Sequence, residues 1–295
     1  MEFFDIVASS SVRLMVPLLL AVLGELISER AGITNIGLEG MMAAGAFIAY
    51  ITAVGDSGLL IAILAASVAG AFVGSLMAIG TVLLRGNGIL VGFSLFVLAP
   101  GLANFLFVQN GVTSATPALP DIAVPYLSEI PLIGPAFFLQ NIFYYVAIGL
   151  TALVWVLFKW TKIGLIISAV GHDPNKSQAK GLNPKAIQTS ALLVCGSFAG
   201  LGGAALSLGA VASYVPNMID GRGFVVISIV ILGRWNVMGA VAGSLFMGLL
   251  DALKLNLPQV SDVPVQFLTA LPWVAVLIML IASARMRTSA PRSLI

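Results

Sequence analysis

Several charged and amide side chains interrupt otherwise apolar stretches of this sequence, where they could contact a polar solute. Glu39 lies between Gly37 and Gly40 in an apolar run, and Asn35 precedes it by four positions. On a continuous helix the two polar side chains would share one face. An ionisable group inside a membrane costs about 2.5–3.5 kcal/mol on insertion scales, so it suggests a polar interior or a partner. The glycines beside Glu39 predict an interrupted helix, whose free backbone groups could reach a ligand.

The C-terminal half carries a second group of such residues. The segment 220–223, Asp-Gly-Arg-Gly, precedes an apolar run that ends at 233–236, Gly-Arg-Trp-Asn. Trp beside Arg is typical of a membrane interface. Asp251 and Lys254 are three residues apart, a spacing that favours an ion pair on one helix.

Glu25 and Glu29, four residues apart, lead into Arg30, and we interpret them as interfacial and structural. For any single charge in the apolar stretches, ion-pair scaffolding is favoured over a solute contact. As a set, these residues predict a polar seam through a helix bundle. The candidates for a translocation path are Asn35, Glu39, Asn104, Arg222 and Asp251.

Motifs for catalysis and metal binding are missing from the sequence. It contains no HExxH, no GxSxG and no GxxxxGK[ST] phosphate loop. The chain therefore cannot hydrolyse ATP by the usual P-loop route, and active transport would need an ion gradient or a separate ATPase chain. His172 and Cys195 are the only residues of their types. We interpret Cys195 as a small buried hydrophobe and expect His172 to make a local hydrogen bond.

The composition indicates what positions these residues. Of 295 residues, 59% are hydrophobic and 9% charged, against about 25% charged in soluble domains. The mean hydropathy of +1.07 agrees. The net charge of only +2 does not indicate nucleic-acid binding. The acidic start, Met1 to Asp5, is unlike a signal peptide, so the first apolar run is expected to stay as a membrane helix.

The sequence predicts an all-α, polytopic bundle of about eight to ten transmembrane spans with interrupted helices, in one permease domain, 1–295. A span needs about 20 mostly apolar residues. Long, continuous apolar runs favour helices over the alternating strands of a barrel. The candidate spans are 11–28, 33–54, 58–83, 88–108, 141–158, 189–213, 223–254 (long enough for a bent pair) and 265–283.

The basic residues orient the bundle. Five lysines fall in the loop 159–188, and three arginines, Arg285, Arg287 and Arg292, fall in the tail. The positive-inside rule puts both segments in the cytoplasm. The Pro-rich link 109–140 carries acids and no base, so it is expected outside, as is the N-terminus.

The segment 171–185 of this loop reads as a short helix with both ends marked. Asp173 is a good N-cap, Pro174 suits the first helical position, and Gly181 can adopt the left-handed conformation after the last turn. Asn183-Pro184 begins a second helix in the same way. From these residues alone, a docking helix for a cytoplasmic partner and a solvated loop remain equally open.

Four ordered motifs resemble those of permease subunits of ATP-binding-cassette (ABC) importers, in the group that takes nucleosides, simple sugars and branched-chain amino acids. They are 26–42 (LISERAGITNIGLEGMM), 169–183 (AVGHDP through GLN), 221–224 with 233–240, and 251–253. The match covers about residues 20–280 and is closest to the nucleoside-type branch. Ribose-type permeases look like GGIDLSVG where this chain has GITNIG at 32–37. His172-Asp173 replaces a common Glu-Asn, and Lys254 replaces a more usual Gln.

The resemblance implies a multi-pass subunit of the bacterial inner (plasma) membrane, surrounded by membrane lipid, that forms no covalent bond with its solute. Its implied partners are a second homologous permease, a cytoplasmic ABC ATPase that binds ATP and Mg²⁺, and an extracytoplasmic solute-binding protein; no cofactor is implied on this chain. The loop 159–188 then becomes a coupling loop. The residues assigned to ATPase coupling are Gly171, His172, Asp173, Pro174, Asn175, Ala179 and Gly181.

The expected solute is a nucleoside, with a simple sugar, a purine base or a riboflavin-like molecule as alternatives within the class. A gradient-driven secondary transporter or channel stays open as a second class, with Glu39 or Asp251 as its ion site. A membrane-embedded enzyme is disfavoured because the sequence shows no convergent nucleophile and base.

Overall fold

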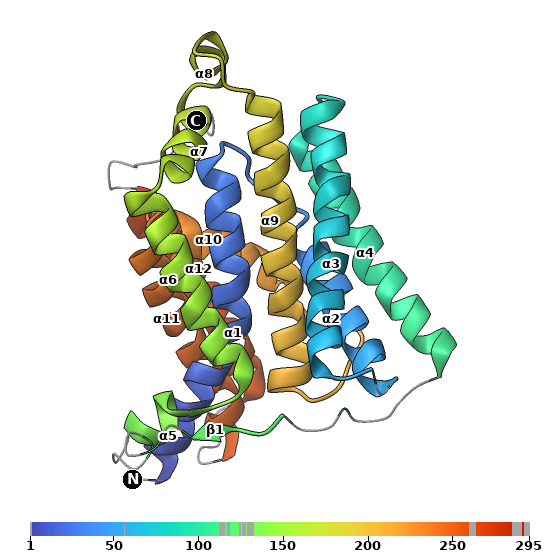
Figure 1. Ribbon diagram of the computed structural model, residues 1–295. Coiled ribbons are helices and arrows are strands. Elements are labelled where there is room, and N and C mark those ends of the chain that lie inside the picture. Colours follow the sequence, from blue (N-terminus) through green and yellow to red (C-terminus); the bar gives the residue numbers. More distant parts are fainter. Residues whose placement is uncertain are drawn as a thin grey trace.

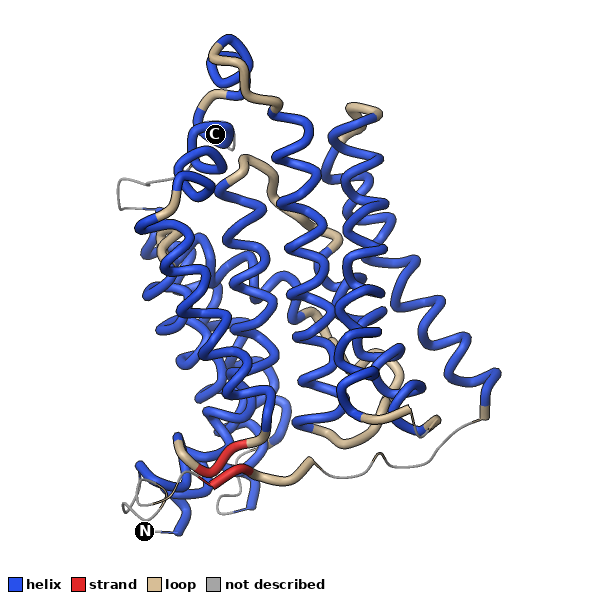
Figure 2. Tube along the Cα trace, viewed as in Figure 1, coloured by secondary structure: helices blue, strands red, loops and turns tan. Residues whose placement is uncertain are grey.

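The computed structural model describes residues 2–55, 57–111, 133–259 and 264–284, with residues 116, 119–123, 125, 128 and 291. Almost all of them belong to helices packed side by side in an elongated bundle (Figures 1 and 2). The described strands are two residues long: β1 (Ile122–Ala123) pairs antiparallel with β2 (Leu139–Gln140) near the N-terminal end. The predicted all-α helix bundle is confirmed.

Six of the described helices are long and apolar enough to cross a membrane. The 29 residues of α1 give it a length of about 43 Å at 1.5 Å per residue, close to the full bilayer thickness. The six are α1 (Glu2–Arg30), α3 (Leu59–Ala78) with the π-helical turn η1 (Ile79–Leu83), α4 (Gly88–Asn110), α6 (Ile142–Trp160), α9 (Pro184–Ala204) with η2 (Ala205–Ala210), and α11 (Val237–Asn256).

Shorter helices complete the bundle. The predicted bent pair at 223–254 is present as α10 (Arg222–Leu232), of half-span length, followed by a turn and α11. The remaining shorter elements are α2 (Leu38–Val54), α5 (Ile133–Phe137), α7 (Lys162–His172), α8 (Pro174–Ala179), η3 (Leu257–Gln259) and α12 (Val265–Ala284). To these six candidate spans, the described part of the chain adds the shorter apolar helices α2, α10 and α12.

The two halves of the bundle repeat one another with opposite direction. After α1, the irregular segment 31–37 turns back into the bundle and leads into α2, and α3 and α4 follow. After α9, the irregular segment 211–221 turns back and leads into α10, and α11 and α12 follow. In Figure 1, α1 and α9 lie side by side and run antiparallel. Inverted repeats with broken helices of this kind are typical of transporters, in which they place the ligand site near the bilayer midplane.

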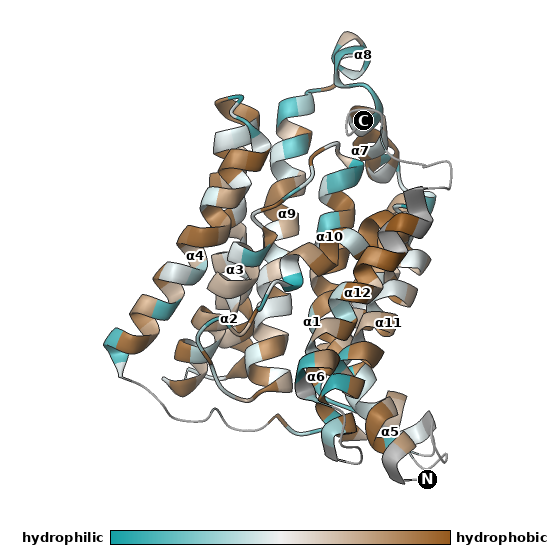
Figure 3. Cartoon of the chain, turned by 180° about the vertical axis from the view of Figure 1, so that it is seen from behind, coloured by the Kyte–Doolittle hydropathy of each residue, from teal (hydrophilic) through white to brown (hydrophobic). Residues whose placement is uncertain are grey.

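Glycine lets the central helices approach closely. A Cβ added at Gly70 of α3 would lie 2.1 Å from the backbone oxygen of Gly196 on α9, so no larger residue fits. The small residues of these helices therefore serve close packing inside the subunit. The outer helices α3 and α4 instead expose large apolar side chains, which suit contact with lipid or with another apolar protein surface. Figure 3 colours much of α4 brown, as hydrophobic.

The loop expected in the cytoplasm and the N-terminus, expected outside, lie at opposite ends of the bundle. Helices α7 and α8 of this loop lie at the end opposite the N-terminus (Figure 1). At the N-terminal end, Arg13 of α1 pairs with Asp121 of the link at 3.1 Å. The tail arginines and much of the link lie outside the described residues.

Candidate functional site

The two interrupted helices begin against each other. The Glu39 carboxylate, in the first turn of α2, accepts a hydrogen bond from the backbone N–H of Gly221 at 2.9 Å, just before α10. It also accepts one from the N–H of Gly223. A Cβ at Gly223 would lie 2.8 Å from the Glu39 backbone nitrogen, so glycine is needed for this approach. Glu39 thus sits at the positive ends of two helix dipoles, where a carboxylate is stabilised.

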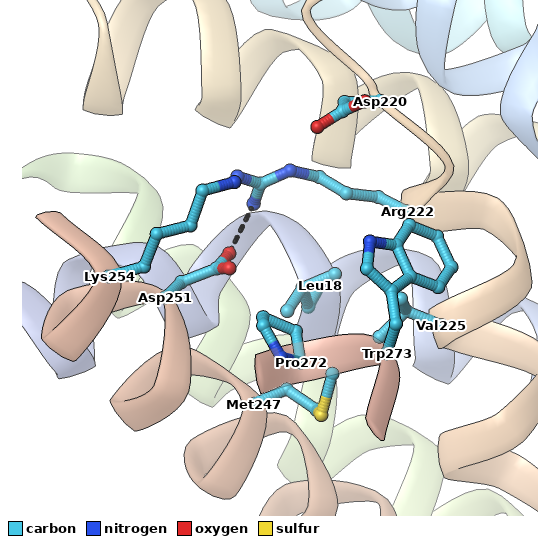
Figure 4. A pocket seen from close by; sticks show the side chains of 9 residues that line it. All are labelled: Leu18, Asp220, Arg222, Val225, Met247, Asp251, Lys254, Pro272 and Trp273. Atoms are coloured by element: carbon cyan, nitrogen blue, oxygen red, sulfur yellow. Dashed lines mark ion pairs between the residues drawn. The ribbon is translucent and has the colours of Figure 1, made fainter. Parts of the chain in front are cut away.

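An ion pair follows directly after this junction. Arg222 at the start of α10 pairs with Asp251 of α11 at 3.1 Å, and both side chains are mostly buried. Figure 4 shows the pair in a cavity of about 30 Å³, large enough for one or two waters, with Lys254 and Trp273 in its wall. Leu18, close to the middle of α1, lines the same cavity, which places it deep in the membrane. The expected ion pair between Asp251 and Lys254 is wrong, because Asp251 pairs with Arg222 of the neighbouring helix α10 instead.

Asn104 connects α4 to the irregular segment 211–221. Its amide nitrogen donates to the Asn217 side-chain oxygen at 2.8 Å, and its oxygen accepts from the Tyr214 hydroxyl at 2.9 Å. Asn217 and Asp220 are exposed and have left-handed backbone conformations, with φ of 60° and 48°. Figure 3 shows the segment rising from the end of α9 to the middle of the bundle, on the surface of this view.

This exposed backbone restricts what can cover it. Irregular backbone at membrane depth is tolerated only where it is buried in protein or lines a water-filled cavity, because lipid cannot satisfy its polar groups. The face made by 211–221 and the neighbouring side of α4 therefore does not face lipid.

Asn35 is the path candidate that lies away from this junction. It is completely buried, its amide nitrogen lies 3.2 Å from the Met41 sulfur, and its backbone N–H donates to Glu25 at 2.9 Å. The helix break at 31–37 separates it from Glu39, so the two do not share a helical face. Glu25 and Glu29, which we interpreted as interfacial and structural, lie in the last turns of α1 and are buried inside the protein, at 0% and 1% exposed.

The segment 171–183 has the predicted helix boundaries. Asp173 caps α8 by accepting from the Lys176 backbone N–H at 3.0 Å, and Pro174 occupies the first helical position. Gly181 follows the helix with φ of 83°, and Asn183 caps α9 by accepting from the N–H of Ala186. The short helix projects beyond the bundle at its end (Figure 1).

The charge of Asp173 is stabilised by its surroundings. The hydrogen bond from the Lys176 backbone, and then the Lys176 ammonium group at 2.9 Å, lower the pKa of this carboxyl below its ordinary value. His172, Asn175 and Ala179 lie on α7 and α8 beside it, and His172 is exposed. Among the described residues no group of His, Cys, Asp or Glu is arranged to hold a metal ion.

Sequence reasoning missed three residues that shape these sites. Tyr214 and Asn217 bind Asn104, and Trp273 covers Gly221, where an added Cβ would lie 2.5 Å from the indole ring. Tyr214 and Asn217 lie on either side of Pro216 between two apolar runs, a pattern that could have indicated a re-entrant segment. No local pattern indicates the position of Trp273.

Comparison with known proteins gives the family. The family model described as "Branched-chain amino acid transport system / permease component" matches residues 7–284. The nucleoside ABC transporter permease protein NupC of Lactococcus lactis is 34% identical over 290 residues, covering 94% of this chain and 91% of the relative. The guanosine ABC transporter permease protein NupQ of Bacillus subtilis is 28% identical, covering 95% and 92%. The glucose ABC transporter permease protein TsgB13 of Haloferax volcanii is 29% identical, covering 80% and 66%.

No solved structure matches the chain significantly. The apolar spans and these relatives identify a multi-pass transport subunit of the plasma membrane, of the kind that works with an ATPase and a solute-binding protein. The chain belongs to the permease family of the branched-chain amino acid transport system type.

Proposed function

We propose that this chain is the permease of an ABC importer for nucleosides. The observation that carries the proposal is the junction at the middle of the bundle, where two interrupted helices, an ion pair and an exposed irregular segment meet. Such junctions are where transporters bind polar solutes. Two similar relatives are named for nucleosides or guanosine.

The charges at the junction favour a neutral solute. Arg222 and Asp251 compensate each other, and Glu39 is held by two helix N-termini. Asp220 and Lys254, which line the same cavity, carry opposite charges, so the charges around the cavity balance without an oppositely charged ligand. The half-buried amide of Asn104 and the exposed amide of Asn217 offer hydrogen bonds of both senses. A nucleoside, which is uncharged and rich in donors and acceptors, fits this chemistry.

The solute path runs along the face formed by 211–221 and α4, and a second permease subunit covers this face. The support is physical: the exposed irregular backbone cannot face lipid, so protein or water must lie against it. Placing the path between two subunits provides both.

Helix α8 receives the motion of the ATPase. It is short, capped at both ends and projects from the bundle on the side that the positive-inside rule makes cytoplasmic. ATP and Mg²⁺ bind to the ATPase chain, and a solute-binding protein delivers the nucleoside to the opposite end.

The test is uptake by the complex of this chain, its second permease and its ATPase in proteoliposomes supplied with the binding protein. We expect ATP-dependent uptake of labelled guanosine, adenosine or uridine. If the complex takes up glucose in an ATP-dependent way and takes up no nucleoside, the solute is a sugar instead. Glucose is the second candidate because one relative is named as a glucose permease. Uptake by this chain alone, without ATP, would reject the importer and select a gradient-driven transporter.

A further inference from the structure

Two carboxyl groups on successive turns of α1 are buried together. Glu25 and Glu29 are 0% and 1% exposed, and they lie one helical turn apart on the same face of α1. The Glu29 oxygen Oε1 is buried with no hydrogen-bond donor among the described residues, so a second negative charge on the pair would be left uncompensated. Like charges in one buried site disfavour double ionisation as well. The pair therefore holds one proton and one negative charge inside the bundle.

The Glu25 end of the pair holds the irregular segment that leads into α2. One oxygen accepts the backbone N–H of Asn35 at 2.9 Å, and the other accepts the Cys195 thiol of α9 at 3.4 Å. The Ser28 hydroxyl, between the two acids, donates to the backbone oxygen of Ile33 at 2.8 Å. This face of α1 thus fixes segment 31–37 at two points.

The Glu29 end holds the turn between α10 and α11. Its carboxyl accepts from the Trp235 indole N–H, and the next residue, Arg30, donates to the Trp235 backbone oxygen at 2.9 Å. Arg234 and Trp235 both adopt left-handed conformations, with φ of 53° and 54°. Such conformations cost on the order of 1–3 kcal/mol each and persist only where surrounding contacts hold them. Contacts from α1 therefore hold both the side chain and the backbone of Trp235 in this turn.

The coupling segment rests on the same end of α1. A Cβ added at Gly171, the next-to-last residue of α7, would lie 2.1 Å from the Arg30 backbone oxygen. Gln188 of α9 donates to the backbone oxygen of Ala31 at 3.2 Å. A displacement of α7 and α8 therefore acts directly on the turn of α1 that carries Glu29 and Arg30.

We propose that Glu25 and Glu29 form a positioning clamp, a proton-sharing carboxyl pair that ties both interrupted segments to one stretch of α1. Through it, movement of the coupling segment reaches α2 and α10 together, and so reaches the junction where Glu39 meets Gly221. The inference rests on the proposed function, because the clamp has this role only if an ATPase drives α8.

The mechanical test uses Trp235→Phe, which removes the indole donor and keeps an aromatic ring. In the proteoliposome assay we expect the number of solute molecules taken up per ATP hydrolysed to fall about fivefold or more, the size of a typical coupling energy. The ATPase rate of the assembled complex stays close to wild type. Trp160→Phe on the exposed surface of α6 is the matched control and should leave the ratio unchanged.

Glutamine substitution supplies a rescue. Glu29→Gln keeps an acceptor for the indole and can donate to Glu25, so we expect a near-normal ratio, whereas Glu29→Leu should lower it as Trp235→Phe does. An unchanged ratio in Trp235→Phe, or a ratio that falls only together with the ATPase rate, would overturn the clamp. A wild-type complex that takes up no nucleoside would instead count against the proposed function.

The shared proton has its own readout, which needs no transport. At neutral pH, the infrared difference between the wild-type complex and the Glu25→Gln/Glu29→Gln double variant should contain the carbonyl band of one protonated carboxylic acid. A difference that shows two carboxylates and no acid band would overturn the proposal, even if Trp235→Phe fails to assemble.

Discussion

The ion pair at the middle of the membrane gives the sharpest energetic prediction. Asp251→Asn removes one charge at nearly constant volume and leaves Arg222 at the N-terminus of α10, where the helix dipole disfavours a cation. Two unit charges 3.1 Å apart attract by roughly 5 kcal/mol at an effective dielectric constant of about 20. The side chains are 20% and 17% exposed, so water screens the pair only partly. Breaking such a pair costs about 3–5 kcal/mol.

We expect Asp251→Asn to lower the free energy of unfolding by about 3 kcal/mol or more, measured by thermal and denaturant unfolding of the purified subunit in detergent. Lys254→Gln is the matched control, because Lys254 lines the same cavity without forming the pair. It should change stability little. An Asp251→Asn variant as stable as the Lys254→Gln control would refute the energetic reasoning.

Replacing both Arg222 and Asp251 distinguishes a role of the pair in stability from a role in solute transport. Replacing a buried ion pair by apolar residues is often neutral or stabilising, so Arg222→Met/Asp251→Leu should recover the stability that Asp251→Asn loses. If the pair lines the solute path, the double variant stays deficient in uptake despite its recovered fold. Full recovery of uptake would show that Arg222 and Asp251 serve only as a scaffold.

Three further predictions concern the junction and the coupling segment. Glu39→Ala leaves the Gly221 N–H without its acceptor, so it should destabilise the subunit by about 1–3 kcal/mol, whereas Glu39→Gln keeps the acceptor and should not. Gly171→Ala forces α7 away from α1 and should reduce ATPase-driven uptake, whereas Gly149→Ala, in open space, should have no effect. Asp173→Asn keeps the α8 cap without a titrating group and should make coupling less sensitive to acid than in wild type.

The sign of the Asp173 effect follows from its lowered pKa. A carboxyl with a lower pKa in the folded state stabilises the fold above its unfolded pKa, and this contribution is lost as pH falls through the folded value. Solute uptake per ATP hydrolysed, measured across the acidic range, should therefore fall first in wild type. Identical acid profiles for wild type and Asp173→Asn would contradict this. Equal unfolding energies for Glu39→Ala and Glu39→Gln, or equal uptake for Gly171→Ala and Gly149→Ala, would contradict the other two.

Local signals made the helices and the coupling segment predictable from sequence. The boundaries of α8 depend on the chemistry of adjacent residues, with Asp173 and Pro174 at one end and Gly181 at the other, and the structure has them where predicted. The break before α2 was likewise indicated by the glycines around Glu39.

Contacts between distant segments were not predictable. Asp251 has a cation three residues away in Lys254, yet it pairs with Arg222, because the position of α10 beside α11 depends on the whole bundle. Glu25 and Glu29 resemble interfacial acids in sequence, and only the packing around α1 shows that they are buried. The inverted repeat can be seen in the order and direction of the helices, but the amino-acid sequences of the two halves show no visible repeat.

Solute should move through this membrane bundle only when a separate ATPase acts on α8. The most direct measurement is crosslinking of a cysteine placed at Gln178 on α8, in a Cys195→Ser background, followed by nucleoside uptake by the same complex. We predict a crosslink to the ATPase subunit and loss of ATP-dependent uptake when it forms. A cysteine that reacts only from the outside, or a crosslinked complex that still transports at the wild-type rate, would contradict it.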